Sequence, residues 1–355
     1  MQLKMMAVGL GGLALGVWVA CLTGLAGGRP VPPELEYRVR ADPDSGFTVR
    51  LTASGLSGRR PSFRMLDGWG LLQDQPSHVE ALEMRDAAGN RIPVSVESEN
   101  GETRWKLSRS PRGALAVRYR VRPYDPYLSA EASFVGSKRW AFLGYSVLLI
   151  PAGVPAYDPM KIQVELETAA PCWSSWPGSR RTFAPPTLHD LWSGFAAAGE
   201  FRSARVSAGG VSVTVLTEER TPAQVGVTIA NRLFPGLRGM HALFGAPPRS
   251  DSLNVLALYR MQPQNGLLSQ VSGSSEERAF LCLATPDRFR DLTGLTVLAA
   301  HECLHFYLGG AVSADGEPPF RNSPDLVWLM EGVTEYLTYR LLERAGSIPP
   351  GETEA

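Results

Sequence analysis

The sequence feature that most constrains the fold is a pair of histidines in the last quarter of the chain. His301, Glu302 and His305 belong to the string His-Glu-Cys-Leu-His. On an α-helix, at about 100° per residue, the two histidines project from nearly the same face one turn apart, and Glu302 lies beside them. Two neutral imidazoles at this spacing can both reach one Zn²⁺ while a fourth position stays open for water. The segment is therefore predicted to be a helix that carries a zinc site.

A second helix is predicted to supply the third ligand. Ser323-Pro324-Asp325 combines a capping hydroxyl, a proline suited to the first turn and an early acid, and Gly346 provides a stop. Glu331 lies on this helix and is our candidate for the third zinc ligand. Glu335 follows one turn later and is placed to accept the free N–H of a ligating histidine, which would orient that ring.

Glu302 is predicted to act as a general base and not as a ligand. A carboxylate next to a metal-activated water can take its proton and later pass it to a leaving amine. The arrangement suits hydrolysis of amide bonds, so the predicted substrate is a peptide or a protein. The competing interpretation is a pair of core histidines on an apolar helix, and Glu331 on its own capped helix favours the metal site. No tyrosine is fixed by spacing as an oxyanion donor.

The N-terminus carries a second informative stretch. An uncharged run from Met5 to Gly28 reaches the roughly 20 residues that a bilayer span requires. Gly24-Leu25-Ala26 places small residues where a signal peptidase cleaves. Residues 1–28 are predicted to be a signal peptide or a membrane anchor, and both alternatives stay open. Either one predicts export to the periplasm or cell envelope, with membrane association if the segment is retained.

The hydrophobic pattern changes period along the chain. From Glu34 onward, apolar residues alternate with polar ones between turn clusters, which predicts many short strands. After Thr221-Pro222 the apolar residues recur at helical spacing, interrupted by short apolar runs that are typical of strands. The predicted fold class is α+β. The predicted domains are a β-rich, sandwich-like N-terminal domain over 34–215, a second domain with the zinc motif over 221–346, and a tail over 347–355.

Composition limits the partners. Lys and Arg number 35, and Asp and Glu also number 35, so the formal net charge is zero. A chain that binds nucleic acid needs a basic surface, so no nucleic-acid partner is predicted. Three tryptophans, Trp173, Trp176 and Trp192, are interpreted as core or domain-interface residues, with a groove lining as the alternative.

The two zinc segments resemble a known family. His301-Glu302-x-x-His305, followed by the run from Leu326 to Tyr336 with its Trp-x-x-Glu-Gly core, resembles the gluzincin zinc metallopeptidases. The similarity is greatest to the glycyl aminopeptidase family, some relatives of which carry a PDZ domain. The resemblance implies a thermolysin-like catalytic domain after the β-rich domain, with His301, His305 and Glu331 on zinc and Glu302 as base. It also implies aminopeptidase activity and leads us to expect that the family's C-terminal part is missing here.

One departure from the family pattern supports a competing hypothesis. The family carries a Gly-Gly-Leu-Glu-His element whose Glu helps to hold the substrate amine, and the nearest counterpart, Asn265-Gly266-Leu267-Leu268-Ser269, lacks that Glu. The alternative function is a non-catalytic, zinc-containing envelope protein that binds peptides or a partner.

Overall fold

The computed structural model describes residues 33–56, 60–69, 72–208, 211–245, 253–261, 271–276, 279–290, 292–308 and 324–349. The predicted signal or anchor segment, residues 1–28, lies outside these residues, and so does the element Asn265–Ser269. Within the described residues, no helix is both long and apolar enough to cross a membrane.

The first part of the chain is built from β-sheets, because its apolar residues alternate with polar ones. Strand β1 shows this directly: Leu35, Tyr37 and Val39 are buried, and the residues between them are exposed. The largest sheet has seven strands and is antiparallel except for the β1–β13 pair. In spatial order its strands are β15 (Gly178–Ser179), β16 (Thr182–Phe183), β13 (Lys161–Leu166), β1 (Glu34–Asp42), β2 (Gly46–Ser54), β9 (Leu115–Val121) and β6 (Val79–Arg85).

Smaller sheets and short helices complete this β-rich part, whose apolar side chains form one core. One four-stranded sheet contains, in order, β10 (Phe134–Val135), β11 (Arg139–Leu143), β17 (Phe195–Gly199) and β14 (Cys172–Ser174). Another contains β12 (Ile150–Pro151), β3 (Ser62–Leu66), β8 (Glu102–Leu107) and β7 (Val94–Glu99). The remaining elements are the pair β4 (Gly68–Trp69) and β5 (Leu72–Gln73), the 3₁₀-helix η1 (Gln75–His78), α1 (Gly144–Val147) and α2 (Leu188–Ser193).

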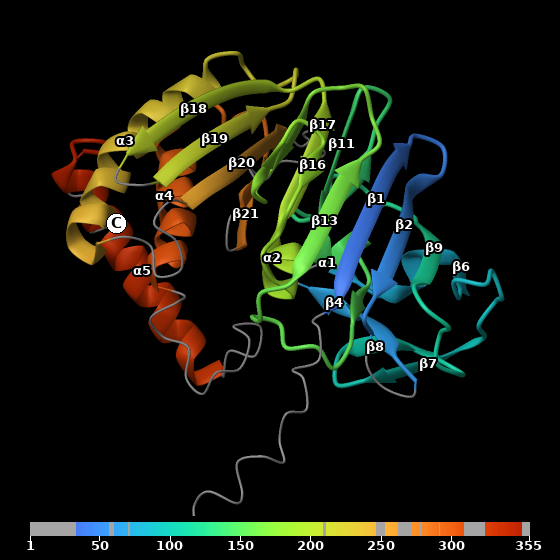
Figure 1. The fold of residues 1–355 in the computed structure, drawn as a ribbon. Helices are drawn as coiled ribbons and strands as arrows, with labels where there is room; N and C mark the ends of the chain where they lie inside the picture. The colour runs from blue at the N-terminus through green and yellow to red at the C-terminus, as the bar shows by residue number, and fades with distance from the viewer. Residues whose placement is uncertain are drawn as a thin grey trace, which may run out of the picture. The chain divides into compact units, whose positions relative to one another are not determined.

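The second part is a five-stranded sheet with three long helices on one face (Figure 1). Its strand pairs β19–β20 and β20–β22 are parallel, and both edge pairs are antiparallel. The strands, in order, are β18 (Arg202–Ala208), β19 (Val211–Thr217), β20 (Leu253–Met261), β22 (Ala279–Ala284) and β21 (Val271–Glu276). The helices are α3 (Val225–Phe244), α4 (Leu292–Leu308) and α5 (Pro324–Arg344).

This five-stranded sheet separates two cores, because alternate residues of each strand face opposite sides. Val255, Ala257 and Tyr259 of β20 pack with α3 and α4, whereas Leu256 and Leu258 join the core of the β-rich part. The predicted fold class, α+β with many strands, is confirmed. The predicted domain limits remain predictions. Strands β18 and β19 belong to the second sheet, so that sheet begins at Arg202, upstream of the predicted boundary between residues 215 and 221.

A guanidinium links the two parts of the fold. Arg260, at the end of β20, is 1% exposed and donates hydrogen bonds to the carbonyl oxygens of Pro126, Ser129 (2.9 Å) and Ala130 (2.7 Å). Its guanidinium also lies 4.9 Å from the centroid of the Phe134 ring. A buried cation is costly unless its donors are satisfied, so these bonds hold the segment after β9 against the end of β20.

Candidate metal centre

The predicted metal ligands are positioned by the packing of α4 against α5. The helix α5 begins at Pro324 and ends at Arg344, as its start and stop signals predict. Gly346 takes the left-handed conformation with φ 66°, and the Ser347 N–H closes the helix end by donating to the Leu342 carbonyl at 2.9 Å. These local signals set the C-terminal end of α5, and the packing of α5 against α4 brings Glu331 to the histidines.

Three donor atoms converge between the two helices. His301 Nε2 lies 3.1 Å from His305 Nε2 and 3.2 Å from Glu331 Oε2, and His305 Nε2 lies 3.6 Å from the same oxygen. A tetrahedral zinc site with ligand distances of about 2.0–2.2 Å has edges of about 3.3–3.6 Å between donor atoms. The three separations therefore fit one ion with two nitrogen ligands and one oxygen ligand.

The hydrogen-bond partners of the two rings also fit a bound cation. His301 Nδ1 lies 3.0 Å from Glu335 Oε2, so a neutral His301 that donates from Nδ1 keeps a lone pair on Nε2. That lone pair faces the lone pairs of Glu331 Oε2, and a cation between the two atoms would remove the repulsion. Burial lowers the pKa of His305, with Glu331 acting in the opposite direction, and the lowered pKa favours the neutral ring that binds metals.

Glu302 lies on the sheet side of α4 and is 8% exposed. Burial and then the Glu302 carboxylate raise the pKa of the Cys303 thiol to about 12, and the same two causes raise the pKa of the Cys282 thiol on β22. The carboxylate is thus close to β22. Cys303 is 1% exposed and packs into the core of the second part.

The polar side chains of α5 are divided between two environments. Thr334 and Thr338 are fully buried, whereas the side chains of Glu331 and Glu335 are 54% and 55% exposed. The two glutamates therefore reach His301 from the solvent side of the α4–α5 contact.

Sequence reasoning missed one feature of the strands. Arg260 is an arginine in the mostly apolar strand β20, and no local signal identifies carbonyl partners about 130 residues earlier. For the tryptophans both stated interpretations apply: Trp176 and Trp192 are buried in the core, and Trp173 is partly exposed and lines a groove together with Trp176.

The comparisons with known proteins give a family-profile match within the β-rich part and similar folds for most of the chain. Residues 37–191, less than half of the chain, match the profile of the Peptidase M61 N-terminal domain. This stretch ends before the second sheet begins. No curated protein sequence matches the chain.

The fold is similar to solved peptidase and hydrolase structures. An aminopeptidase N family protein from Idiomarina loihiensis aligns with a TM-score of 0.69 at 20% identity, over 88% of this chain and 55% of that one. Yeast LTA4 hydrolase in complex with bestatin aligns with a TM-score of 0.55 at 14% identity, over 89% of this chain and 49% of that one. The chain thus spans about half the length of the structures that it matches.

Proposed function

We propose that the chain is a zinc-dependent metallopeptidase in which His301, His305 and Glu331 bind the metal. The observation that carries this proposal is the convergence of their donor atoms from two helices at separations of 3.1–3.6 Å. Bound Zn²⁺ would supply a Lewis acid and lower the pKa of a coordinated water. Glu335 orients His301 by accepting a hydrogen bond from its Nδ1–H, and this leaves Nε2 as the ring nitrogen that can bind metal.

Glu302 is the proposed general base. Its carboxylate, on the residue after the first ligand, takes a proton from the attacking water and delivers it to the amine of the departing peptide fragment. Its side chain is 8% exposed, so the carboxylate is shielded from bulk water.

Peptides are the proposed substrates because two independent comparisons point to peptidases. The profile over residues 37–191 is that of a peptidase N-terminal domain, and the fold is similar to an aminopeptidase N family protein. Finer assignments stay within this proposal: a thermolysin-like second domain, the glycyl aminopeptidase family, and aminopeptidase specificity. Export to the cell envelope through residues 1–28 is proposed as well, and fractionation of cells that express the full chain would test it.

The decisive experiment compares the purified wild-type chain with Glu302→Gln. We expect one zinc per chain in both proteins, by elemental analysis, and a loss of hydrolysis of about 10²–10⁴-fold in the variant on a peptide library. Equal turnover by wild type and variant would exclude Glu302 as the base, and wild-type protein without zinc would exclude the metal centre.

A second candidate function is a non-catalytic, zinc-containing envelope protein that binds peptides or a partner. The observation in its favour is Leu268 at the position where the similar family has the amine-binding Glu. This candidate predicts one zinc per chain and no turnover of any library peptide by the wild-type protein, so the same experiment separates the two functions.

A further inference from the structure

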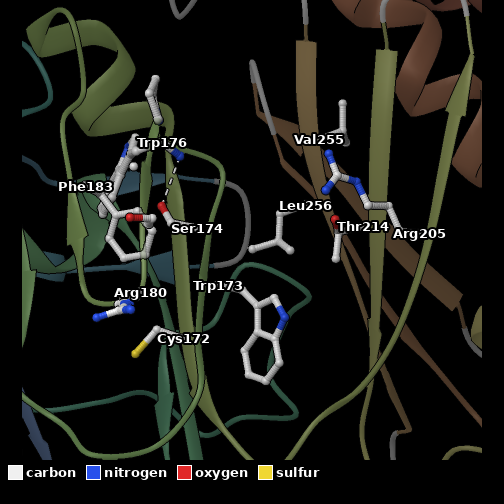
Figure 2. A pocket seen from close by; sticks show the side chains of 13 residues that line it. Cys172, Trp173, Ser174, Trp176, Arg180, Phe183, Arg205, Thr214, Val255 and Leu256 are labelled. Atoms are coloured by element: carbon white, nitrogen blue, oxygen red, sulfur yellow. Dashed lines mark hydrogen bonds between the residues drawn. The ribbon is translucent and has the colours of Figure 1, made fainter.

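A groove lies outside the metal centre, between the β-rich part and the face of the second sheet opposite its helices. Its volume is about 310 Å³. One wall comes from β14 and the β15–β16 hairpin, and the other from β18, β19 and β20. Figure 2 shows Trp173 of the first wall and Leu256 and Thr214 of the second projecting toward the space between the walls. The groove thus combines an indole with aliphatic and hydroxyl groups.

The described lining residues include two arginines and no acid. Arg205 lies directly across from Thr214, and Thr214 lies directly across from Leu256, so cation, hydroxyl and aliphatic side chain form one row over three strands. Arg205 is exposed, and its Nε donates to Ser212 Oγ at 2.7 Å, which orients the guanidinium. Its two terminal nitrogens carry the N–H donors that can pair with a carboxylate. This row is complementary to a ligand that carries an anionic group next to an apolar group.

The hairpin that closes the groove holds a strained arginine. Arg180 has φ 57°, a left-handed conformation that is uncommon and strained for a residue with a side chain. Nearby, Gly178 leaves no room for a side chain, because an added Cβ would lie 2.4 Å from the Thr182 carbonyl oxygen. The backbone at position 180 favours glycine, but the turn has an arginine there, and this arginine lines the groove.

We propose that this groove binds the C-terminal residue of a peptide, with the carboxylate at Arg205 and an apolar or aromatic side chain against Trp173. A planar guanidinium recognises a carboxylate through paired N–H donors, and an indole offers a flat apolar surface. The volume is at the low end of the range for ligand pockets, about 300–1,000 Å³, so it suits one residue and not a long segment. The assignment to peptides rests on the proposed function; the binding of an apolar carboxylate does not.

The test compares N-acetyl-L-phenylalanine with its amide, two probes that differ only in a charged carboxylate or a neutral carboxamide. Binding is measured by calorimetry on the full chain treated with a chelator, so that a carboxylate cannot bind through a metal ion. We expect the acid to bind at least ten times more tightly than the amide, and Arg205→Gln to reduce the affinity for the acid to that for the amide. We expect Trp173→Ala to weaken both probes by a similar factor.

Arg40→Gln is the matched control, because Arg40 is an exposed arginine of β1 outside the groove. It should leave both affinities unchanged. Equal affinity for acid and amide, loss of binding in the control, or no binding of either probe at millimolar concentration would each overturn the proposal. Adding zinc back should not change groove binding, so the outcome is separate from the test of hydrolysis.

Discussion

His301 and Glu335 form a pair across two helices, with Nδ1 of the ring 3.0 Å from Oε2 of the carboxylate. The pair sets the tautomer of a proposed ligand, although Glu335 itself lies on the solvent side of α5. Support of a ligand by a second residue typically changes metal affinity by about 10–100-fold.

The first prediction follows from that pair. Glu335→Ala should weaken zinc binding by about 10–100-fold, because His301 loses the acceptor that orients its ring. Glu335→Gln should have a smaller effect, since the amide oxygen still accepts the N–H. Competition with a chromophoric chelator measures both, and Tyr336→Phe, at the neighbouring position with 60% exposure, is the control. Unchanged affinity in Glu335→Ala would contradict the role.

The second prediction concerns folding. Since the proposed ligands lie on α4 and α5, zinc should bind the folded chain and not the unfolded one. At free zinc one hundred times the dissociation constant, the free energy of unfolding should rise by about 2.7 kcal/mol. Thermal unfolding with zinc or with a chelator measures the difference. The difference should disappear in His305→Ala; a stabilisation that persists there would point to another site.

The third prediction addresses the link between the two parts of the fold. Arg260→Met should lower the free energy of unfolding by on the order of 3–5 kcal/mol, because it removes the hydrogen bonds that the carbonyl oxygens of Pro126, Ser129 and Ala130 accept from the buried guanidinium. Arg40→Met removes an exposed arginine and should change stability by no more than about 0.5 kcal/mol. Urea denaturation compares the two, and similar values would show that the buried bonds contribute little.

The fourth prediction is a pH dependence. Burial raises the pKa of the Cys172 thiol to about 11, so only a small fraction is thiolate near neutral pH. In a Cys21→Ser background, the rate of alkylation by iodoacetamide should rise about tenfold per pH unit until the pH approaches 11. Mass spectrometry locates the label, and Cys282 and Cys303, both buried, should react only after unfolding. A rate that levels off near pH 9 would contradict the raised pKa.

Much of the metal centre is predictable from sequence because its determinants are local. The spacing of His301 and His305 fixes their common face, and the start and stop signals of α5 place Glu331 on a helix. The height of Glu331 relative to the histidines and its exposure are not local, since both depend on how α5 packs against α4.

The second sheet shows the same limit. Strand β20 is recognisable from its apolar run, but β18 and β19 alternate like the strands before them, so their sequence does not reveal that β19 pairs with β20 beyond α3. The partners of Arg260 depend on the same long-range packing and are invisible to local pattern.

Tyr259 and Arg260 are consecutive residues of the central strand, yet one faces the helices and the other reaches the carbonyl oxygens of the β-rich part. A slip of β20 by a single residue would exchange them, placing a guanidinium among apolar side chains beside α4. Such a misaligned sheet would place the cation away from the three carbonyl oxygens that accept its hydrogen bonds, which is costly for a buried charge. The native register of β20 therefore satisfies this guanidinium, and the nearest shifted register does not.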